Sequence, residues 1–461
     1  MRRNIDDGWR QHLSALEALA RESGLVYHPV EFEAVPDSLM MEIAIYGLPV
    51  RMPHWSFGVR YIYRLVQHRL GMSRLFEVVF PGNPGRAYLA RNNSNAENVL
   101  VAAHVLGHAD FSANNLLFRA SAAQVGDHIV EQAAAHARQI GAAIEEHGAA
   151  RVEAVLDAAL ALEQHIDIDA RLRRERYDEN PQKASTETGD PFLQRFRSLG
   201  PDVAAPARAT GPTPRAPIPP HPERDLLWFI AQYAPELEPW ERDIFLMVRE
   251  ESFYFYPVFA SQIMNEGWAS YWHARLLREA DFLPQDVYVD AIKCHSDVVR
   301  PTASGDRVAL DINPYHLGFW LWEKIIEEHG VEHARRVMQQ DDDFAFVRGH
   351  LTAELASELK MFRYKGAAKG PFQVQPEDIG ALHEALLAPK YGFGAPSVAA
   401  AHVRVDGTLE LAHDHTTDGR GLDAERASRV LDYLVKVWRR PIVLNTVNGE
   451  GAGFEVAARP V

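Results

Sequence analysis

The sequence predicts a mainly α protein with short strands. It is expected to form a large helical domain with a buried core of polar His and Glu side chains, plus a small C-terminal α+β domain. From Ser94 onward, apolar residues recur at helical spacing over most of the chain. Two of the apolar helical segments also carry His and Glu on one face. Residues 366–461 instead contain short runs in which apolar and polar residues alternate, which is typical of strands.

The composition is that of a folded protein of 461 residues, of which 47% are apolar and 10% aromatic. This length and apolar content allow a sizeable core and more than one domain. The 48 basic and 63 acidic residues give a net charge of -15, which argues against nonspecific binding to nucleic acid or anionic membranes. We therefore expect no nucleic-acid partner.

Features of the chain also indicate its compartment. The one cysteine, Cys294, permits no intramolecular disulfide and fits a reducing compartment. The first residues carry acidic side chains and lack the apolar centre of a signal peptide. The chain contains no uncharged apolar run of about 18 residues, the length that a transmembrane helix requires. The expectation is a cytoplasmic protein without a membrane span.

The first part of the chain mixes helices and strands. Residues 5–24 have the apolar spacing of one amphipathic helix that ends at Gly24. Residues 26–58 carry Pro and Gly too often for long helices, and residues 60–71 return to helical spacing. Two short strands are expected within residues 76–91, and helices from there to about residue 172.

Four segments describe the predicted organisation. Residues 1–199 form the first part of the helical core, and residues 200–225 a linker so rich in Pro that neither helix nor sheet can continue through it. Residues 226–365 form the second part of the core. Residues 366–461 form the small α+β domain, with a hairpin turn at Asp406-Gly407, a helix up to Trp438 and a final strand.

The helix expected from Ser94 to Phe118 contains two histidines in an apolar run. Ser94 and Glu97 match the capping-box pattern, in which each side chain binds a free amide at the helix start. His104 and His108 are four residues apart, so their imidazoles share one face and can reach a single ion. In zincins a Glu base follows the first His directly, but this chain has Val105 there.

A second apolar helix, residues 263–277, carries Glu266 and His273. Buried Glu is rare unless it is paired or ligates a metal, and the segment Asn-Glu-Gly-Trp-Ala resembles the one that supplies the third zinc ligand, a Glu, in gluzincin metallopeptidases. This pattern predicts a metal site of His104, His108 and Glu266. His273 lies two turns, or about 10 Å, along the axis from Glu266, which suits a supporting or substrate-facing role better than direct ligation.

Two questions remain open at this level. The His and Glu residues could form a buried hydrogen-bonded network without metal, whereas a di-iron bundle is disfavoured because it needs paired Glu-x-x-His motifs. A catalytic base must also come from elsewhere than position 105. The candidates are Glu250, Glu251, His273 and His295.

Five blocks of the sequence resemble the SpoVR family, the stage V sporulation protein R-like proteins. In chain order they are GLPVRMPHWSFG, AHVLGHADFSANN, IMNEGWASYWH, CHSDVV and INPYHLGFWLWE. The resemblance covers nearly the whole chain outside the linker. It implies a role in spore cortex formation or in stationary-phase and stress physiology, and as partners a AAA-type serine protein kinase and a von Willebrand-like companion protein. No biochemical activity comes with the family.

Two functions are therefore compared. The first is a metal-dependent hydrolase of an amide bond in peptide or peptidoglycan-related material, with zinc, iron or manganese as the divalent metal. The second is a noncatalytic regulator or adaptor that acts with the kinase. The missing base, the separate C-terminal domain and the linker with Thr210 and Thr213 favour the second.

Overall fold

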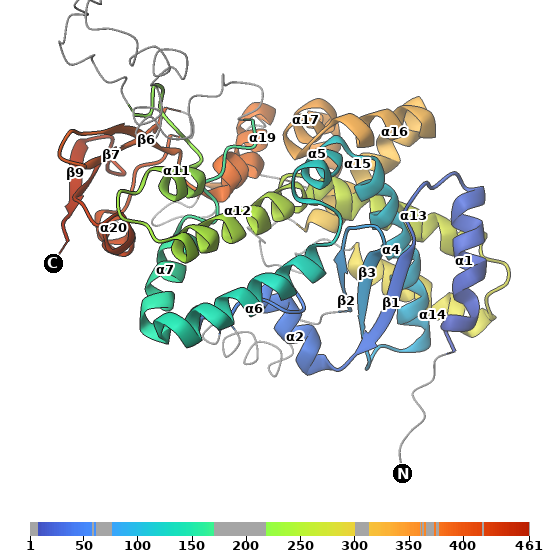
Figure 1. Ribbon diagram of the computed structural model, residues 1–461. Helices are drawn as coiled ribbons and strands as arrows, with labels where there is room; N and C mark the ends of the chain where they lie inside the picture. The colour runs from blue at the N-terminus through green and yellow to red at the C-terminus, as the bar shows by residue number, and fades with distance from the viewer. Residues whose placement is uncertain are drawn as a thin grey trace, which may run out of the picture. The chain divides into compact units, whose positions relative to one another are not determined.

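The computed structural model describes residues 8–57, 60, 76–169, 218–299, 313–359, 361, 364–365, 373–374, 378–416 and 419–460. Most of these residues are helical and the strands are short, as predicted (Figure 1). None of the described helices is long and apolar enough to cross a membrane. Residues 61–71 of the predicted helix at 60–71, most of the predicted linker, and Thr210 and Thr213 lie outside the described residues.

The chain divides into two compact units. Unit 1 comprises Met1–Glu145 and Glu250–Phe393, and unit 2 comprises Glu146–Arg249 and Gly394–Val461. Two helices, α6 (Ile129–His147) and α12 (Pro239–Ala260), contribute residues to both. The predicted boundaries at 199 and 365 lie in or beside residues outside the described ranges and stay predictions.

The other helices of unit 1 include those that carry the candidate site. They are α1 (Arg10–Glu22), α2 (Asp37–Tyr46), α4 (Asn95–Asn114), α5 (Leu116–Val125), α13 (Gln262–Glu279), α14 (Gln285–Val298), α15 (Pro314–His329), α16 (Val331–Gln340), α17 (Asp343–His350), α18 (Ala353–Glu358), α19 (Ile379–Leu387) and the 3-10 helix η1 (Ala388–Gly394).

Unit 1 also contains a three-stranded sheet in the order β1-β3-β2. The strands are β1 (Val30–Val35), β2 (Glu77–Phe80) and β3 (Gly85–Ala90). β2 runs antiparallel to β3, with Glu77 opposite Leu89, and β1 runs parallel to β3. A separate pair, β4 (Tyr364–Lys365) and β5 (Gln373–Val374), is antiparallel. The sequence predicts β2 and β3 correctly, and the sheet lies beside α4 (Figure 1).

Residues 26–58, in which the sequence predicts no long helix, form short elements. This region contains both β1 and the ten-residue helix α2. α2 starts after Pro36 and ends at Gly47, whose φ of 76° favours glycine because that backbone conformation strains other residues. The Pro and Gly residues thus mark the ends of a short helix.

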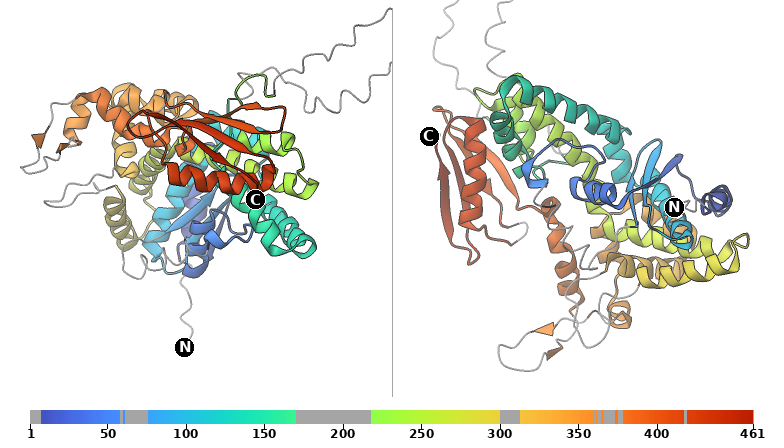
Figure 2. Two further views of the ribbon diagram at one scale, coloured as in Figure 1. Left: turned by 90° about the vertical axis from the view of Figure 1, so that its left-hand side faces the viewer. Right: turned by 90° about the horizontal axis from the view of Figure 1, so that it is seen from below.

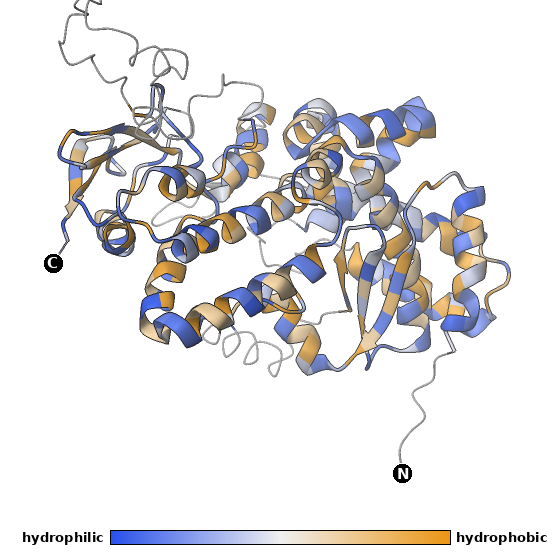
Figure 3. Cartoon of the chain, in the orientation of Figure 1, coloured by the Kyte–Doolittle hydropathy of each residue, from blue (hydrophilic) through white to orange (hydrophobic). Residues whose placement is uncertain are grey.

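The core of unit 1 centres on α4, α13 and α15, which pack side by side. Trp268, Trp272 and Trp322 are fully buried there, and the rings of Trp268 and Trp322 lie 4.8 Å apart. The outer helix α1 is amphipathic, since it buries Leu16 and Ala20 against this core and carries hydrophilic residues on its other face (Figure 3). α4 and α13 are therefore internal helices, as their apolar sequences predict.

Unit 2 joins helices to the C-terminal four-stranded sheet. Its helices are α7 (Ala149–Ala161), α11 (Leu226–Tyr233) and α20 (Ala424–Trp438), and its strands are β6 (Val398–Val403), β7 (Leu409–His413), β8 (Ile442–Val447) and β9 (Gly453–Ala458), in the order β6-β7-β8-β9. β7 and β8 are parallel, and α20 connects them and lies along the sheet (Figure 2).

The predicted α+β elements of this region are confirmed. β6 and β7 form a hairpin around Asp406-Gly407, where Gly407 has a φ of 85°. Among the described residues of 366–461, the sequence does not predict β5, α19, η1 and β9. Two helices assigned by the sequence to the core, α7 and α11, contact α20 and β6 respectively. At the end of the predicted linker, Glu223 is 1% exposed and pairs with Ala400 through two backbone hydrogen bonds.

Candidate metal centre

Local capping fixes the helix that carries the two histidines. The Ser94 side chain accepts a hydrogen bond from the Glu97 amide at 3.2 Å, and the Glu97 carboxylate accepts one from the Ser94 amide at 2.6 Å. The predicted capping box is thus confirmed. Farther along α4, His104 and His108 are only 2% and 9% exposed.

The start of α13 is held by a buried carboxylate. Asp343 accepts hydrogen bonds from the Ile263 and Met264 amides at 3.0 and 2.9 Å, and Lys390 lies 3.0 Å from the same carboxylate. These contacts satisfy amides that a helix start leaves free. They fix the first turn of α13, directly before Glu266.

Three side chains from these two helices converge, as the sequence predicts. Glu266 Oε2 lies 3.5 Å from His104 Nε2 and 3.4 Å from His108 Nε2. One ligand atom of each residue lies within 4.8 Å of the other two, which among the described residues is the one group of His, Cys, Asp and Glu that meets this condition. We call His104, His108 and Glu266 the triad.

Hydrogen bonding leaves parts of the triad unsatisfied. His108 Nδ1 is 2.9 Å from Asn265 Oδ1, and donating there leaves its Nε2 lone pair facing the triad. His104 Nε2 and Glu266 Oε2 are buried and have no hydrogen-bond partner among the described residues. Such orphaned atoms are rare in protein interiors, and two imidazole nitrogens with one carboxylate oxygen match the donor set of divalent zinc.

The three triad residues shift one another's pKa values. Burial alone would raise the pKa of Glu266, but the charge of His108 and the closeness of both imidazoles hold the pKa of this carboxylate well below its usual range. Burial lowers the pKa of His108, and the nearby Glu266 carboxylate outweighs this and raises it. The pKa of His104 is lowered, first by burial and then by His108. Glu266 is therefore ionised and ready to act as a ligand.

The sequence interpretation misses two further residues at this site. Glu77, the first residue of β2, has Oε1 3.9 Å from His104 Nε2, and burial followed by the charge of Glu266 raises its pKa to about 7. Tyr315, in the first turn of α15, stacks on His104 with ring centres 6.0 Å apart. The charge of Glu266 and burial raise the pKa of Tyr315 well above 10. The only sequence signal for Glu77 is a carboxylate that opens an otherwise apolar strand.

Of the predicted candidate bases, His273 contacts the triad and His295 contacts His273. His273 Nδ1 is 2.9 Å from His104 Nδ1, and His273 Nε2 is 2.6 Å from His295 Nδ1. Burial lowers the pKa of both, to about 4 for His295 and well below 6.5 for His273. The interpretation of His273 as a supporting residue fits this geometry.

The other two candidate bases belong to a different cluster. Glu250 and Glu251, on α12, lie 3.4 and 3.3 Å from His136 of α6. Arg51 donates to Glu251 at 2.8 Å. α12 packs these carboxylates against α6, so the structure places them with His136 and Arg51 and gives them no contact with the triad.

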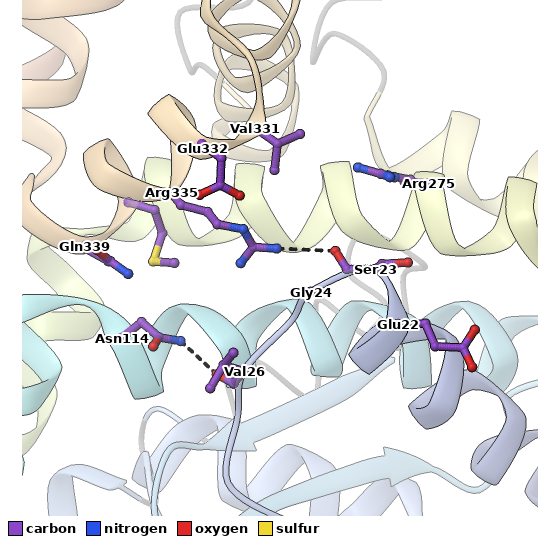
Figure 4. Close-up of a pocket in the computed structure, with 11 residues that line it drawn as sticks. Glu22, Ser23, Gly24, Val26, Asn114, Arg275, Val331, Glu332, Arg335 and Gln339 are labelled. Carbon is purple, nitrogen blue, oxygen red and sulfur yellow. Dashed lines mark hydrogen bonds between the residues drawn. The ribbon is translucent and has the colours of Figure 1, made fainter.

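A surface pocket of about 460 Å³ is also separate from the triad (Figure 4). Residues of α1, α4, α13 and α16 line it, and Arg335 donates to the Ser23 carbonyl across it. The guanidinium carbons of Arg275 and Arg335 lie 5.1 and 5.3 Å from the centre of the Trp272 ring. These contacts connect α1 and α16 to α13, and the pocket contains none of the triad residues.

These features define a helical protein with a buried His/His/Glu cluster between two core helices. The sequence profile described as "SpoVR like protein" matches residues 9–379, so the chain belongs to the SpoVR family, as its sequence blocks predict. It is 31% identical over 332 residues to the "Uncharacterized protein YcgB" of Escherichia coli (strain K12). The alignment covers 68% of this chain and 62% of that relative, so the chain spans less than two thirds of the relative's length. No solved structure matches the chain.

Proposed function

We propose that the protein holds one divalent metal ion between His104, His108 and Glu266 and hydrolyses an amide bond in peptide or peptidoglycan-related material. One observation carries this proposal: three ligand atoms lie within 4.8 Å of one another in the interior, and two of them lack a hydrogen-bond partner among the described residues. A bound cation would satisfy both orphaned atoms.

The donor set favours zinc. Two imidazoles and one carboxylate leave a tetrahedral zinc ion with one open position, the arrangement of catalytic sites, and iron or manganese accept the same ligands. Such an ion would polarise a carbonyl group and lower the pKa of a water. The resemblance of the Glu266 segment to that of gluzincin metallopeptidases supports an amide substrate.

Glu77 is the residue that we propose as general base. Glu77 lies on β2, and its carboxylate oxygen Oε1 is 3.9 Å from His104 Nε2. It can accept the proton of an attacking water and return it to the leaving amine. Glu77 thus takes the role of the general base, which Val105 in the usual zincin position cannot fill. Tyr315, next to His104, can donate a hydrogen bond to the substrate carbonyl.

Product analysis tests this function. Zinc-loaded protein is incubated with peptide and muropeptide mixtures, and mass spectrometry records newly formed amines and carboxylates. The proposal expects cleavage by the wild type and by His136→Gln, which alters a buried histidine outside the triad, and none by His108→Ala. Equal product from the wild type and His108→Ala would overturn it.

The physiological setting is a further proposal by resemblance to the family. It comprises spore cortex formation or stationary-phase and stress physiology, with a AAA-type serine protein kinase and a von Willebrand-like protein as partners. The same experiment separates the hydrolase from a noncatalytic adaptor, which would yield no cleavage product from any variant.

A further inference from the structure

The imidazoles of His104, His273 and His295 form a continuous row of contacts that starts at the triad residue His104. His104 Nδ1 contacts His273 Nδ1 at 2.9 Å, and His273 Nε2 contacts His295 Nδ1 at 2.6 Å. His273 is fully buried on α13, whereas His295 on α14 is partly exposed. Both ring nitrogens of His273 are engaged in these two contacts.

These two contacts restrict which ring nitrogen of each imidazole carries the proton. A neutral imidazole has one N–H donor and one lone-pair acceptor. If Nε2 of His104 presents its lone pair to a metal, Nδ1 carries the proton and donates to His273 Nδ1. His273 then carries its own proton on Nε2 and donates to His295 Nδ1. One arrangement of protons therefore satisfies both contacts and leaves the metal-facing nitrogen of His104 unprotonated.

We propose that His273 and His295 are positioning residues that hold His104 in the Nδ1–H tautomer and orient its ring toward the triad. Metal-bound histidines usually donate their second N–H to a carboxylate, a carbonyl or water. His108 follows that pattern with Asn265. At His104 the Nδ1 contact at 2.9 Å is to the His273 imidazole, and the Ala269 backbone is a further hydrogen-bond partner. This inference rests on the proposed metal site.

The test compares two replacements of His273. Glutamine keeps one acceptor and one donor, whereas leucine keeps neither, and both remove the ring from the core. Zinc affinity is measured by competition with a chelating dye, and the thermal midpoint of the metal-free protein reports folding. His273→Leu should bind zinc about 10- to 100-fold more weakly than His273→Gln, the range for lost supporting partners of metal ligands. The two variants should melt at similar temperatures.

His295 supplies a second comparison because its partly exposed position tolerates substitution. His295→Leu should bind zinc more weakly than His295→Gln, by a smaller factor than at position 273. In ¹⁵N-histidine NMR spectra of the zinc-loaded wild type, Nδ1 of His104 should carry the proton.

The outcomes separate this inference from the proposed function. If the Leu and Gln variants at both positions bind zinc equally while His104→Ala does not bind it, the positioning role is wrong and the metal site stands. If the wild type binds no zinc, both are wrong. If the leucine variants alone lose zinc affinity, the positioning role is confirmed. A purely structural role would lower the zinc affinity of the leucine and glutamine variants alike.

Discussion

Gly267 and Gly318 bring the backbones of α13 and α15 into direct contact. A Cβ atom at Gly267 would lie 2.3 Å from the carbonyl carbon of Gly318, and one at Gly318 would lie 2.1 Å from the Ile263 carbonyl oxygen. Backbone atoms cannot yield as a flexible side chain can, so both positions require glycine. Because Glu266 directly precedes Gly267, this contact also sets the position of the carboxylate in the triad.

Gly267→Ala should therefore reduce both stability and metal binding. Overpacking a close helix contact costs about 1–3 kcal/mol of unfolding free energy, and displacement of α13 should move Glu266 away from the histidines. The matched control is Gly141→Ala in α6, where an added Cβ meets nothing within 4 Å. The control should stabilise the helix by up to about 1 kcal/mol. Urea unfolding and zinc titration measure both effects, and a Gly267→Ala protein as stable as the control would refute the close contact.

Glu77→Gln should abolish amide hydrolysis without removing the metal. The substitution keeps the size of the side chain but cannot accept a proton, and loss of a general base lowers the rate by roughly 100-fold or more. Metal content should stay at the wild-type level because Glu77 is not one of the triad. Glu33→Gln on β1, the strand at the other edge of the same sheet, is the control and should change neither property. Loss of metal in Glu77→Gln would instead identify Glu77 as a ligand.

His136 should make stability depend on pH. Burial lowers its pKa, but hydrogen bonds to Glu250 and Glu251 outweigh burial and raise it to about 9. The pKa of His136 in the folded state thus exceeds the unfolded value of about 6.5. The stabilisation that protonated His136 supplies is therefore complete below pH 6.5 and is lost as pH rises through 9. At its full extent this stabilisation amounts to about 3 kcal/mol of unfolding free energy.

Comparison of the wild type with His136→Gln isolates this effect from other titrating groups. Unfolding free energies are measured between pH 6 and 10. The stability advantage of the wild type should shrink as pH rises through this range. An advantage that stays constant with pH would show that folding does not raise the pKa of His136.

The triad could be predicted because helical geometry relates residues that are close in sequence. The spacing of His104 and His108 places them on one face, and the apolar surroundings of both helices indicate burial. That the helix of Glu266 packs on the helix of the histidines follows from the need of each polar face for a partner.

Other parts of the site depend on contacts that local patterns do not encode. Glu77 reaches the triad because of the register of β2 in its sheet, and register is a property of tertiary packing. Glu250 and Glu251 look like available bases in the sequence, but His136 and Arg51, both more than a hundred residues earlier in the chain, engage them. For the same reason the sequence does not predict β1, whose parallel partner lies beyond α2.

The central claim is that the triad holds a metal ion, and elemental analysis tests it most directly. Wild type, His108→Ala and the control His136→Gln are purified without a histidine tag and analysed for zinc, iron and manganese. The account predicts about one metal ion per chain in the wild type and the control, and loss of that ion in His108→Ala. No metal in the wild type, or equal metal in all three proteins, would contradict it and leave His104, His108 and Glu266 as a buried hydrogen-bonded network.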